Sequence, residues 1–126
     1  MPEADRERGQ STIEFVLLLP FLAAVFAALV EVALLAGDQA RLWHAAREAA
    51  RVAVVDSDPI QAAVAAESGG LSPLELSIDP EVAYRIQGRP LTVRIHYEPP
   101  GHLPLLGLIA RSVDLNATAT MRIEQP

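Results

Sequence analysis

The amino-acid sequence predicts an α+β fold: a long N-terminal helix, transmembrane at first and amphipathic afterwards, packs with a short second helix on a small antiparallel sheet of three to four strands. Three observations lead to this prediction. An apolar run of membrane-spanning length lies near the N-terminus, apolar residues at helical spacing follow it, and the period changes to two in the C-terminal half. The two halves of the chain are therefore built differently.

The composition excludes several classes of protein. The chain of 126 residues is about one domain long, and little more than a small module remains beyond the apolar run. It contains no cysteine, so an exported domain must be held by packing without disulfides. The net charge of -6 and the scattered arginines argue against a nucleic-acid partner, which would require a clustered basic face.

The N-terminal region divides into a polar leader and an apolar helix. Residues 1–9 are polar and charged, and we expect a leader there rather than a folded element. Residues 15–36 are apolar apart from one carboxylate, Glu31. Because about 20 residues cross the core of a bilayer, we expect residues 10–36 to form a transmembrane helix. Pro20 removes a backbone donor inside it and predicts a kink.

Beyond Gly37 the apolar residues take the spacing of an amphipathic helix. The residues on its apolar face are Leu42, Ala45, Ala46, Ala49 and Ala53. We therefore expect the helix to continue over 37–55 and to cover the sheet with this face. Asp58 as N-cap and Pro59 at the first helical position begin a shorter helix, expected over 59–68.

The C-terminal half alternates apolar and polar residues, which is the period of half-buried strands. The predicted strands are 74–79, 82–87, 91–98 and 112–124. Turn sequences at Asp79-Pro80 and Gly88-Arg89-Pro90 separate the first three and favour an antiparallel meander. Residues 37–126 are thus expected to form one domain beyond the transmembrane helix.

Three features have more than one interpretation. Glu31 either meets a partner helix or marks where the lipid ends. Trp43 is either a core residue facing the sheet or an anchor at the membrane interface. The apolar loop from Leu103 to Ala110 is extra core, an exposed subunit contact or a patch that touches lipid.

The sequence predicts no enzyme, no cofactor and no metal site. The histidines, His44, His96 and His102, have no spacing typical of metal ligands. No Ser-His-Asp arrangement or glycine-rich phosphate loop is present, and capping accounts for Asp58 without catalysis.

Gly9 and Glu14 form the motif with a chemical implication. A carboxylate such as that of Glu14 costs roughly 2.5 to 3.5 kcal/mol at the centre of a membrane and less at its edge, so its place on the apolar run needs a reason. Gly9 has no side chain, so a peptidase can approach the backbone closely there. A cut after Gly9 would make Gln10 the first residue and place its new positive amine one helical turn from Glu14.

These residues resemble the type IV prepilins, and more closely the TadE-like pseudopilins of tight-adherence pilus systems. The resemblance rests on Arg8-Gly9, on Glu14-Phe15, on Leu19-Pro20 within the apolar run, on the segment from Ala45 to Ala53 and on the closing segment from Ala117 to Glu124. It implies that a membrane-embedded aspartate prepilin peptidase cuts between Gly9 and Gln10. It also implies that Glu14 pairs with the terminal amine of a neighbouring subunit during filament assembly. Gln10 stands where pilins commonly carry a methylated phenylalanine.

By this resemblance the protein is a minor pseudopilin that takes part in assembly of a tight-adherence (type IVc) pilus for surface adhesion. The implied partners are prepilin peptidase, other pilins and pseudopilins, the pilus assembly platform and membrane lipid. The implied location is the cytoplasmic membrane, single-pass with the N-terminus inside and residues 37–126 outside, or the pilus or cell surface. The alternative is a signal-anchored extracytoplasmic ligand-binding domain unrelated to pili. Cleavage near Ala36 would favour this alternative.

Overall fold

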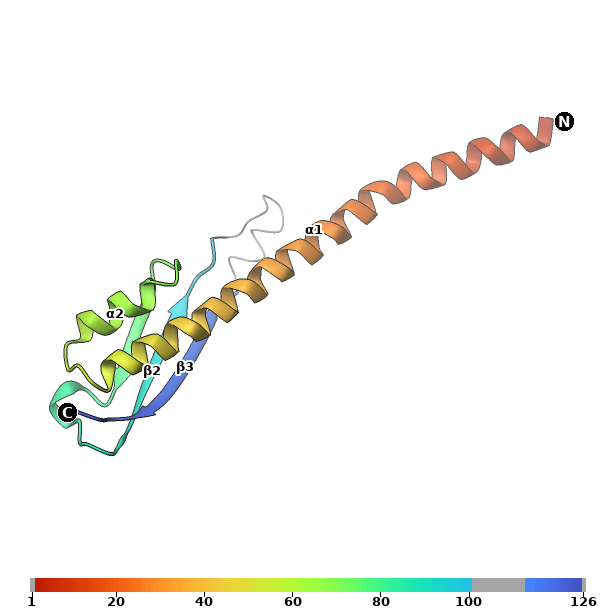
Figure 1. The fold of residues 1–126 in the computed structure, drawn as a ribbon. Helices are drawn as coiled ribbons and strands as arrows, with labels where there is room; N and C mark the ends of the chain where they lie inside the picture. The colour runs from red at the N-terminus through yellow and green to blue at the C-terminus, as the bar shows by residue number, and fades with distance from the viewer. Residues whose placement is uncertain (1, 101–112, 126) are drawn as a thin grey trace.

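The computed structural model of the protein describes residues 2–100 and 113–125 and confirms the α+β architecture. Its elements are the helices α1 (Pro2–Ala53) and α2 (Pro59–Glu67), the strands β1 (Glu75–Asp79), β2 (Pro90–Tyr97) and β3 (Leu115–Arg122), and the 3-10 helix η1 (Val82–Tyr84). The N-terminal half of α1 projects away from the sheet, and its C-terminal half lies along β2 and β3 (Figure 1).

Helix α1 runs without interruption through Pro20 and Gly37, over 52 residues. It begins at Pro2, so the expectation that residues 1–9 are not folded was wrong. The physical reason is that the alanine, glutamate and arginine residues before Gly9 are good helix formers and extend the helix towards the N-terminus. The kink at Pro20 and removal of residues 1–9 as a leader stay predictions.

The three strands pair in the order β1-β2-β3, and both pairs are antiparallel. Ile95 in the central strand lies opposite Leu76 on one side and Ala117 on the other. The predicted strands at 74–79 and 91–98 are confirmed to within a residue at each end. The predicted strand 112–124 is observed as β3 (Leu115–Arg122), and residue 112 and the apolar loop from Leu103 to Ala110 lie outside the described residues.

The predicted strand 82–87 was wrong, because this segment forms η1 and a loop. Its apolar residues Val82, Tyr84 and Ile86 are exposed. The residue that points inward is Arg85, which is 7% exposed and donates from Nη1 to the carbonyl oxygen of Ala53 at 3.1 Å. Arg85 therefore ties the connection between β1 and β2 to the end of α1, and the sheet has three strands among the described residues.

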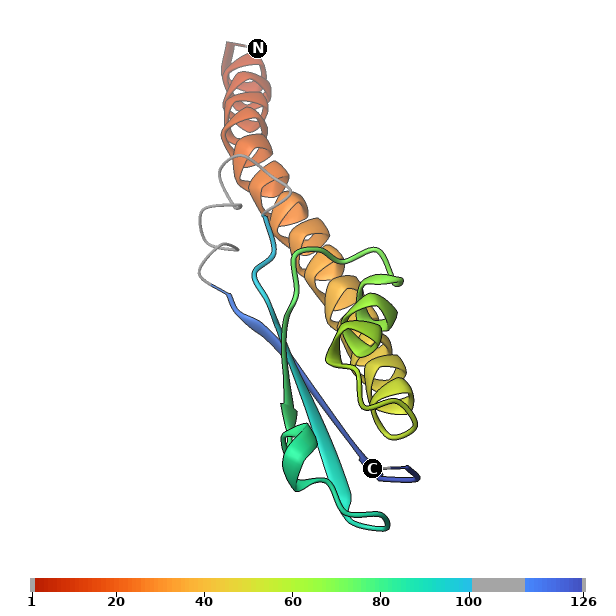
Figure 2. The ribbon, with the colours of Figure 1, turned by 90° about the vertical axis from the view of Figure 1, so that its left-hand side faces the viewer.

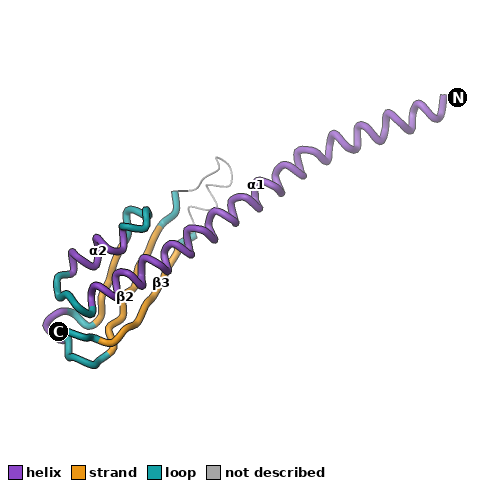
Figure 3. Tube along the Cα trace, in the orientation of Figure 1, coloured by secondary structure: helices purple, strands orange, loops and turns teal. Residues whose placement is uncertain are grey.

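Helix α1 covers one face of the sheet, and α2 packs against α1 on the same side (Figures 2 and 3). The predicted apolar face of α1 is confirmed as buried, from Leu42 to Ala53. Small side chains allow close packing of α1 and α2, and Ala62 and Ala66 of α2 belong to the same core. Trp43 is 55% exposed, so its interpretation as a core residue was wrong and the membrane-interface anchor stays a prediction.

Candidate functional site

The projecting half of α1 carries a continuous apolar surface that the chain itself does not cover. The exposed large side chains there include Ile13, Phe15, Val16, Leu17, Leu18, Leu19, Phe21, Leu22, Phe26, Leu29 and Val32. By length and composition the helix can cross a membrane, and none of its most apolar stretch is buried within the chain. An exposed surface of this size requires lipid or another protein to remove it from water.

Gln10 and Glu14 meet on one face at the start of this surface. The Nε2 of Gln10 donates a hydrogen bond to Oε1 of Glu14 at 3.2 Å, one helical turn away. A Cβ atom added to Gly9 would meet nothing within 4 Å, so packing within the chain does not require glycine there. The structure thus brings together Gln10 and Glu14, while Phe15 is exposed to the surroundings of the helix.

Two carboxylates further along α1 are buried, unlike the apolar residues around them. Glu31 is 4% exposed although Val32 beside it is 63% exposed, and Asp38 is 7% exposed. Oδ1 of Asp38 lies 3.8 Å from Nη1 of Arg41. The chain itself therefore shields Glu31 even before any partner helix or lipid is considered.

The N-terminal segment matches a known protein family. Residues 9–51 match the family model described as TadE-like protein. Over these residues the chain is similar to the TadE-like family. No curated protein and no solved structure matches the chain. The match begins at the glycine before Gln10, covers the apolar surface and most of the helix face that packs on the sheet, and ends before α2.

The match to the TadE-like family and the apolar N-terminal helix together suggest a pilin-like protein associated with a Tad pilus. Proteins of this kind are generally structural rather than enzymatic. The helix is consistent with a single-pass membrane anchor. The sheet lies beyond the residues that match the TadE-like family.

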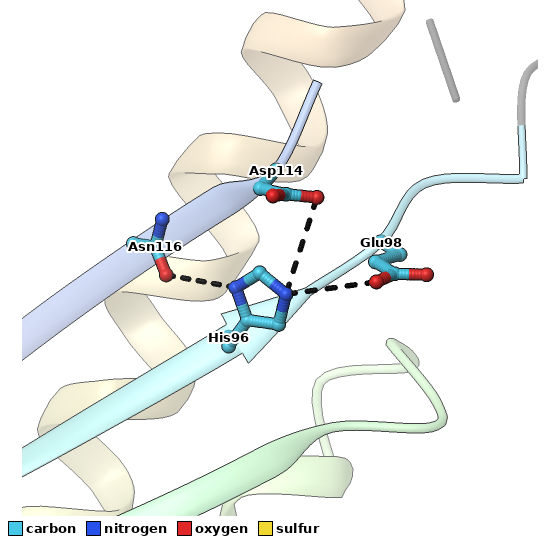
Figure 4. Close-up of polar contacts among 4 residues, drawn as sticks. All are labelled: His96, Glu98, Asp114 and Asn116. Atoms are coloured by element: carbon cyan, nitrogen blue, oxygen red, sulfur yellow. Dashed lines mark hydrogen bonds and ion pairs between the residues drawn. The ribbon is translucent and has the colours of Figure 1, made fainter. Parts of the chain in front are cut away.

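A polar cluster lies on the face of the sheet opposite α1, where β2 ends and β3 begins (Figure 4). Nδ1 of His96 lies 2.9 Å from Oδ1 of Asn116. Nε2 of the same ring lies 3.8 Å from Oε1 of Glu98 and 4.0 Å from Oδ1 of Asp114. The His96 side chain also lines a depression of about 520 Å³ on this face, so it is reachable from solvent.

The surroundings of His96 favour its charged form. The hydrogen bond with Asn116 raises the pKa of the imidazole above its ordinary value, and desolvation opposes this in part. The negative charges of Asp114, Glu75 and Glu98 act in the same direction as the hydrogen bond. The ring therefore lies in a negative field on an otherwise polar sheet face.

The spacing of the three histidines relative to one another gives no indication of this cluster. The available signal was strand alternation: His96 and Glu98 are two residues apart and share one face, as do Asp114 and Asn116. What the spacing did not reveal was that the antiparallel register places Asn116 directly opposite His96.

Proposed function

We propose that this TadE-like protein is a membrane-anchored minor pseudopilin that takes part in assembly of a tight-adherence (type IVc) pilus for surface adhesion. The observation that carries the proposal is the contact of Gln10 with Glu14, 3.2 Å between Nε2 and Oε1, at the start of an uncovered apolar helix. The match to the TadE-like family over residues 9–51 supports it.

The first proposed step is cleavage after Gly9 by a prepilin peptidase. Hydrolysis of the Gly9–Gln10 peptide bond would release residues 1–9 with a new carboxylate and leave Gln10 with a free amine. A peptidase needs the backbone out of the helix, and glycine favours such opening because it is about 1 kcal/mol less favourable than alanine in a helix interior. The space around Gly9 leaves the backbone open to approach.

The second proposed step uses Glu14 in assembly. The amine created at Gln10 would carry a positive charge close to the Glu14 carboxylate, because the two residues already share one face of α1. The exposed carboxylate of Glu14 is also open to the amine of a neighbouring subunit. At the edge of lipid an unpaired carboxylate is costly, so pairing between subunits would favour docking in one register.

The proposed placement has the N-terminus in the cytoplasm, a single membrane span over residues 10–36 and the sheet domain outside. The partners are the prepilin peptidase, other pilins and pseudopilins, the assembly platform and membrane lipid, with the cytoplasmic membrane or the pilus at the cell surface as the location. The exposed Trp43 fits an anchor where the helix leaves the lipid.

Intact-mass analysis of the protein co-expressed with its prepilin peptidase tests the proposal. The expected mature chain begins at Gln10, and Gly9→Val is expected to block cleavage because its branched side chain crowds the backbone at the cut. Gly37→Val is the matched control, since Gly37 is also a helical glycine with nothing within 4 Å of an added Cβ. An intact leader would contradict the proposal, and a new terminus near Ala36 would favour the signal-anchored ligand-binding domain instead.

A further inference from the structure

We propose that His96, Glu98 and Asp114 bind one divalent transition-metal ion of the zinc class, at the end of the sheet where β2 stops and β3 starts. The proposal rests on the geometry of the polar cluster in Figure 4 and is independent of the role in pilus assembly.

Asn116 sets which nitrogen of His96 is available to a ligand. Because Oδ1 of Asn116 accepts a hydrogen bond at 2.9 Å, the proton of the neutral ring lies on Nδ1. Nε2 then presents its lone pair towards the carboxylates of Glu98 and Asp114. A histidine whose second nitrogen is held by an amide or carboxylate oxygen is the usual arrangement of a metal ligand.

The distances leave room for an ion between the three ligand atoms. Nε2 of His96 lies 3.8 Å from Oε1 of Glu98 and 4.0 Å from Oδ1 of Asp114, and all three atoms lie within 4.8 Å of one another. A hydrogen bond between an imidazolium and a carboxylate is typically about 2.7 to 2.9 Å long. Both separations from Nε2 exceed this length. Two atoms that each bind zinc at about 2.1 Å lie about 3.4 Å apart in a tetrahedral site, so the exposed carboxylates would move about 0.5 Å closer to Nε2 on binding.

Charge supports a cation rather than a direct contact. Within residues 2–100 and 113–125, His96 is the partner in the ion pairs of both Glu98 and Asp114, and no arginine pairs with either carboxylate. A protonated His96 supplies one positive charge against the two negative charges of Glu98 and Asp114, so a net negative charge remains at this point. A divalent ion bound to the neutral ring would supply two positive charges and balance both carboxylates.

The ligand set selects the class of metal. One imidazole nitrogen with two carboxylate oxygens suits zinc, and manganese more weakly, whereas calcium and magnesium favour oxygen ligands alone. The exposed carboxylates leave further coordination positions open to water.

The ion would join the two ends of the connection between β2 and β3. His96 and Glu98 come before this connection and Asp114 comes after it. The same end of the sheet is held to α1 by the side chain of Gln39, whose Nε2 donates to the carbonyl oxygen of Asn116 at 2.9 Å. Metal binding to the folded chain would therefore stabilise the sheet at the end nearest the projecting half of α1.

Titration of Zn²⁺ alone into the full chain in detergent, followed by calorimetry, tests the site. We expect one ion per chain, and a loss of affinity of at least about tenfold in His96→Gln and in Asp114→Asn. Asn116→Ala is expected to weaken binding by about tenfold, because the ring loses its orientation while all three ligands remain. His44→Gln is the matched control, since His44 is an exposed histidine on α1, outside the cluster.

Histidine-selective NMR on the same samples gives a second measurement. Addition of Zn²⁺ should shift the imidazole signals of His96 and leave those of His44 unchanged, and Mg²⁺ at the same concentration should shift neither. Circular dichroism shows whether each variant is folded. The proposal is overturned if Zn²⁺ does not bind the folded chain, if folded Asp114→Asn binds as tightly as the wild type, or if the shift follows His44 or His102.

Discussion

The side chain of Gln10 donates to that of Glu14 across one turn of α1, with 3.2 Å between Nε2 and Oε1. This contact places the residue expected to become the N-terminus on the same helix face as the carboxylate at the edge of the apolar surface. A free amine at residue 10 would compete with the side-chain amide for Glu14. The contact would therefore link the proposed processing of the leader to the pairing proposed for assembly.

Glu14→Gln should abolish pilus assembly while membrane insertion is retained. The substitution keeps a hydrogen-bonding oxygen for Gln10 but removes the negative charge that would attract the amine of a neighbouring subunit. Surface pili counted by electron microscopy and membrane fractionation of the subunit measure the two effects. Glu48→Gln, which neutralises an exposed glutamate on the same helix, serves as the control. A normal number of pili with Glu14→Gln would refute the role of this carboxylate.

Arg85→Met should destabilise the sheet domain by about 1 to 3 kcal/mol, because the carbonyl oxygen of Ala53 loses a buried donor at 3.1 Å. The same guanidinium donates from Nε to the carbonyl oxygen of Pro80 at 3.4 Å. Urea unfolding, followed by near-ultraviolet circular dichroism, measures the change. Arg94→Met, on the exposed face of the sheet, should change stability by no more than about 0.5 kcal/mol. Equal changes in stability for the two substitutions would show that the hydrogen bonds of Arg85 do not stabilise the fold.

Ala49→Leu should destabilise the fold by about 1 to 3 kcal/mol, since Ala49 is 0% exposed and extra methyl groups overfill a close-packed core. Ala40→Leu makes the same change at an exposed position of the same helix and should be nearly neutral. Thermal unfolding of both variants in the same detergent compares them. If Ala49→Leu unfolded at the same temperature as the wild type, this would contradict the close packing of α1 on the sheet.

Tyr97 should titrate at higher pH than an ordinary tyrosine. Burial raises the pKa of its hydroxyl, the charge of Asp38 adds to the effect, and Arg41 opposes it. The pKa of Tyr97 in the folded state exceeds the unfolded value of about 10. Its contribution to the free energy of unfolding is therefore complete below pH 10 and is lost as pH rises through the folded pKa. Absorbance of the phenolate in Tyr84→Phe, which leaves Tyr97 as the remaining tyrosine, measures this pKa. A midpoint at or below 10 in the folded protein would contradict the expectation.

Asp38→Asn should lower the pKa of Tyr97 towards its ordinary value without abolishing the rise, because burial is the larger cause. The same absorbance titration in Tyr84→Phe with Asp38→Asn gives the comparison. A pKa that did not fall would exclude the charge of Asp38 as a contributor.

Several elements could be predicted because their signals are local. The apolar run, the helical spacing from Leu42 to Ala53 and the cap of α2 each depend on neighbours within a few residues. The structure bears out the cap, since Oδ1 of Asp58 accepts a hydrogen bond from the backbone N–H of Ile60 at 3.0 Å. Strands β1 and β2 could be recognised for the same reason, since alternation shows which residues face a core.

The segment 82–87 shows where alternation misleads. Val82, Tyr84 and Ile86 have the period of a strand, but they face solvent and Arg85 turns inward. The deciding contacts are with the backbone carbonyl oxygens of Ala53 and Asp56, which lie about thirty residues away in the chain. No pattern within residues 82–87 indicates that these carbonyl oxygens lie close enough to accept hydrogen bonds from Arg85.

Local patterns in the sequence are enough to predict the apolar membrane-length helix, its amphipathic continuation that covers a sheet, and the Gly9–Glu14 spacing that predicts processing and assembly. The number of strands, the exposure of Trp43 and the proximity of His96 to Asp114 follow from tertiary contacts. The physical reason is range: helix spacing and capping act between residues close in the chain, whereas strand register and inward-pointing polar groups depend on contacts between distant segments.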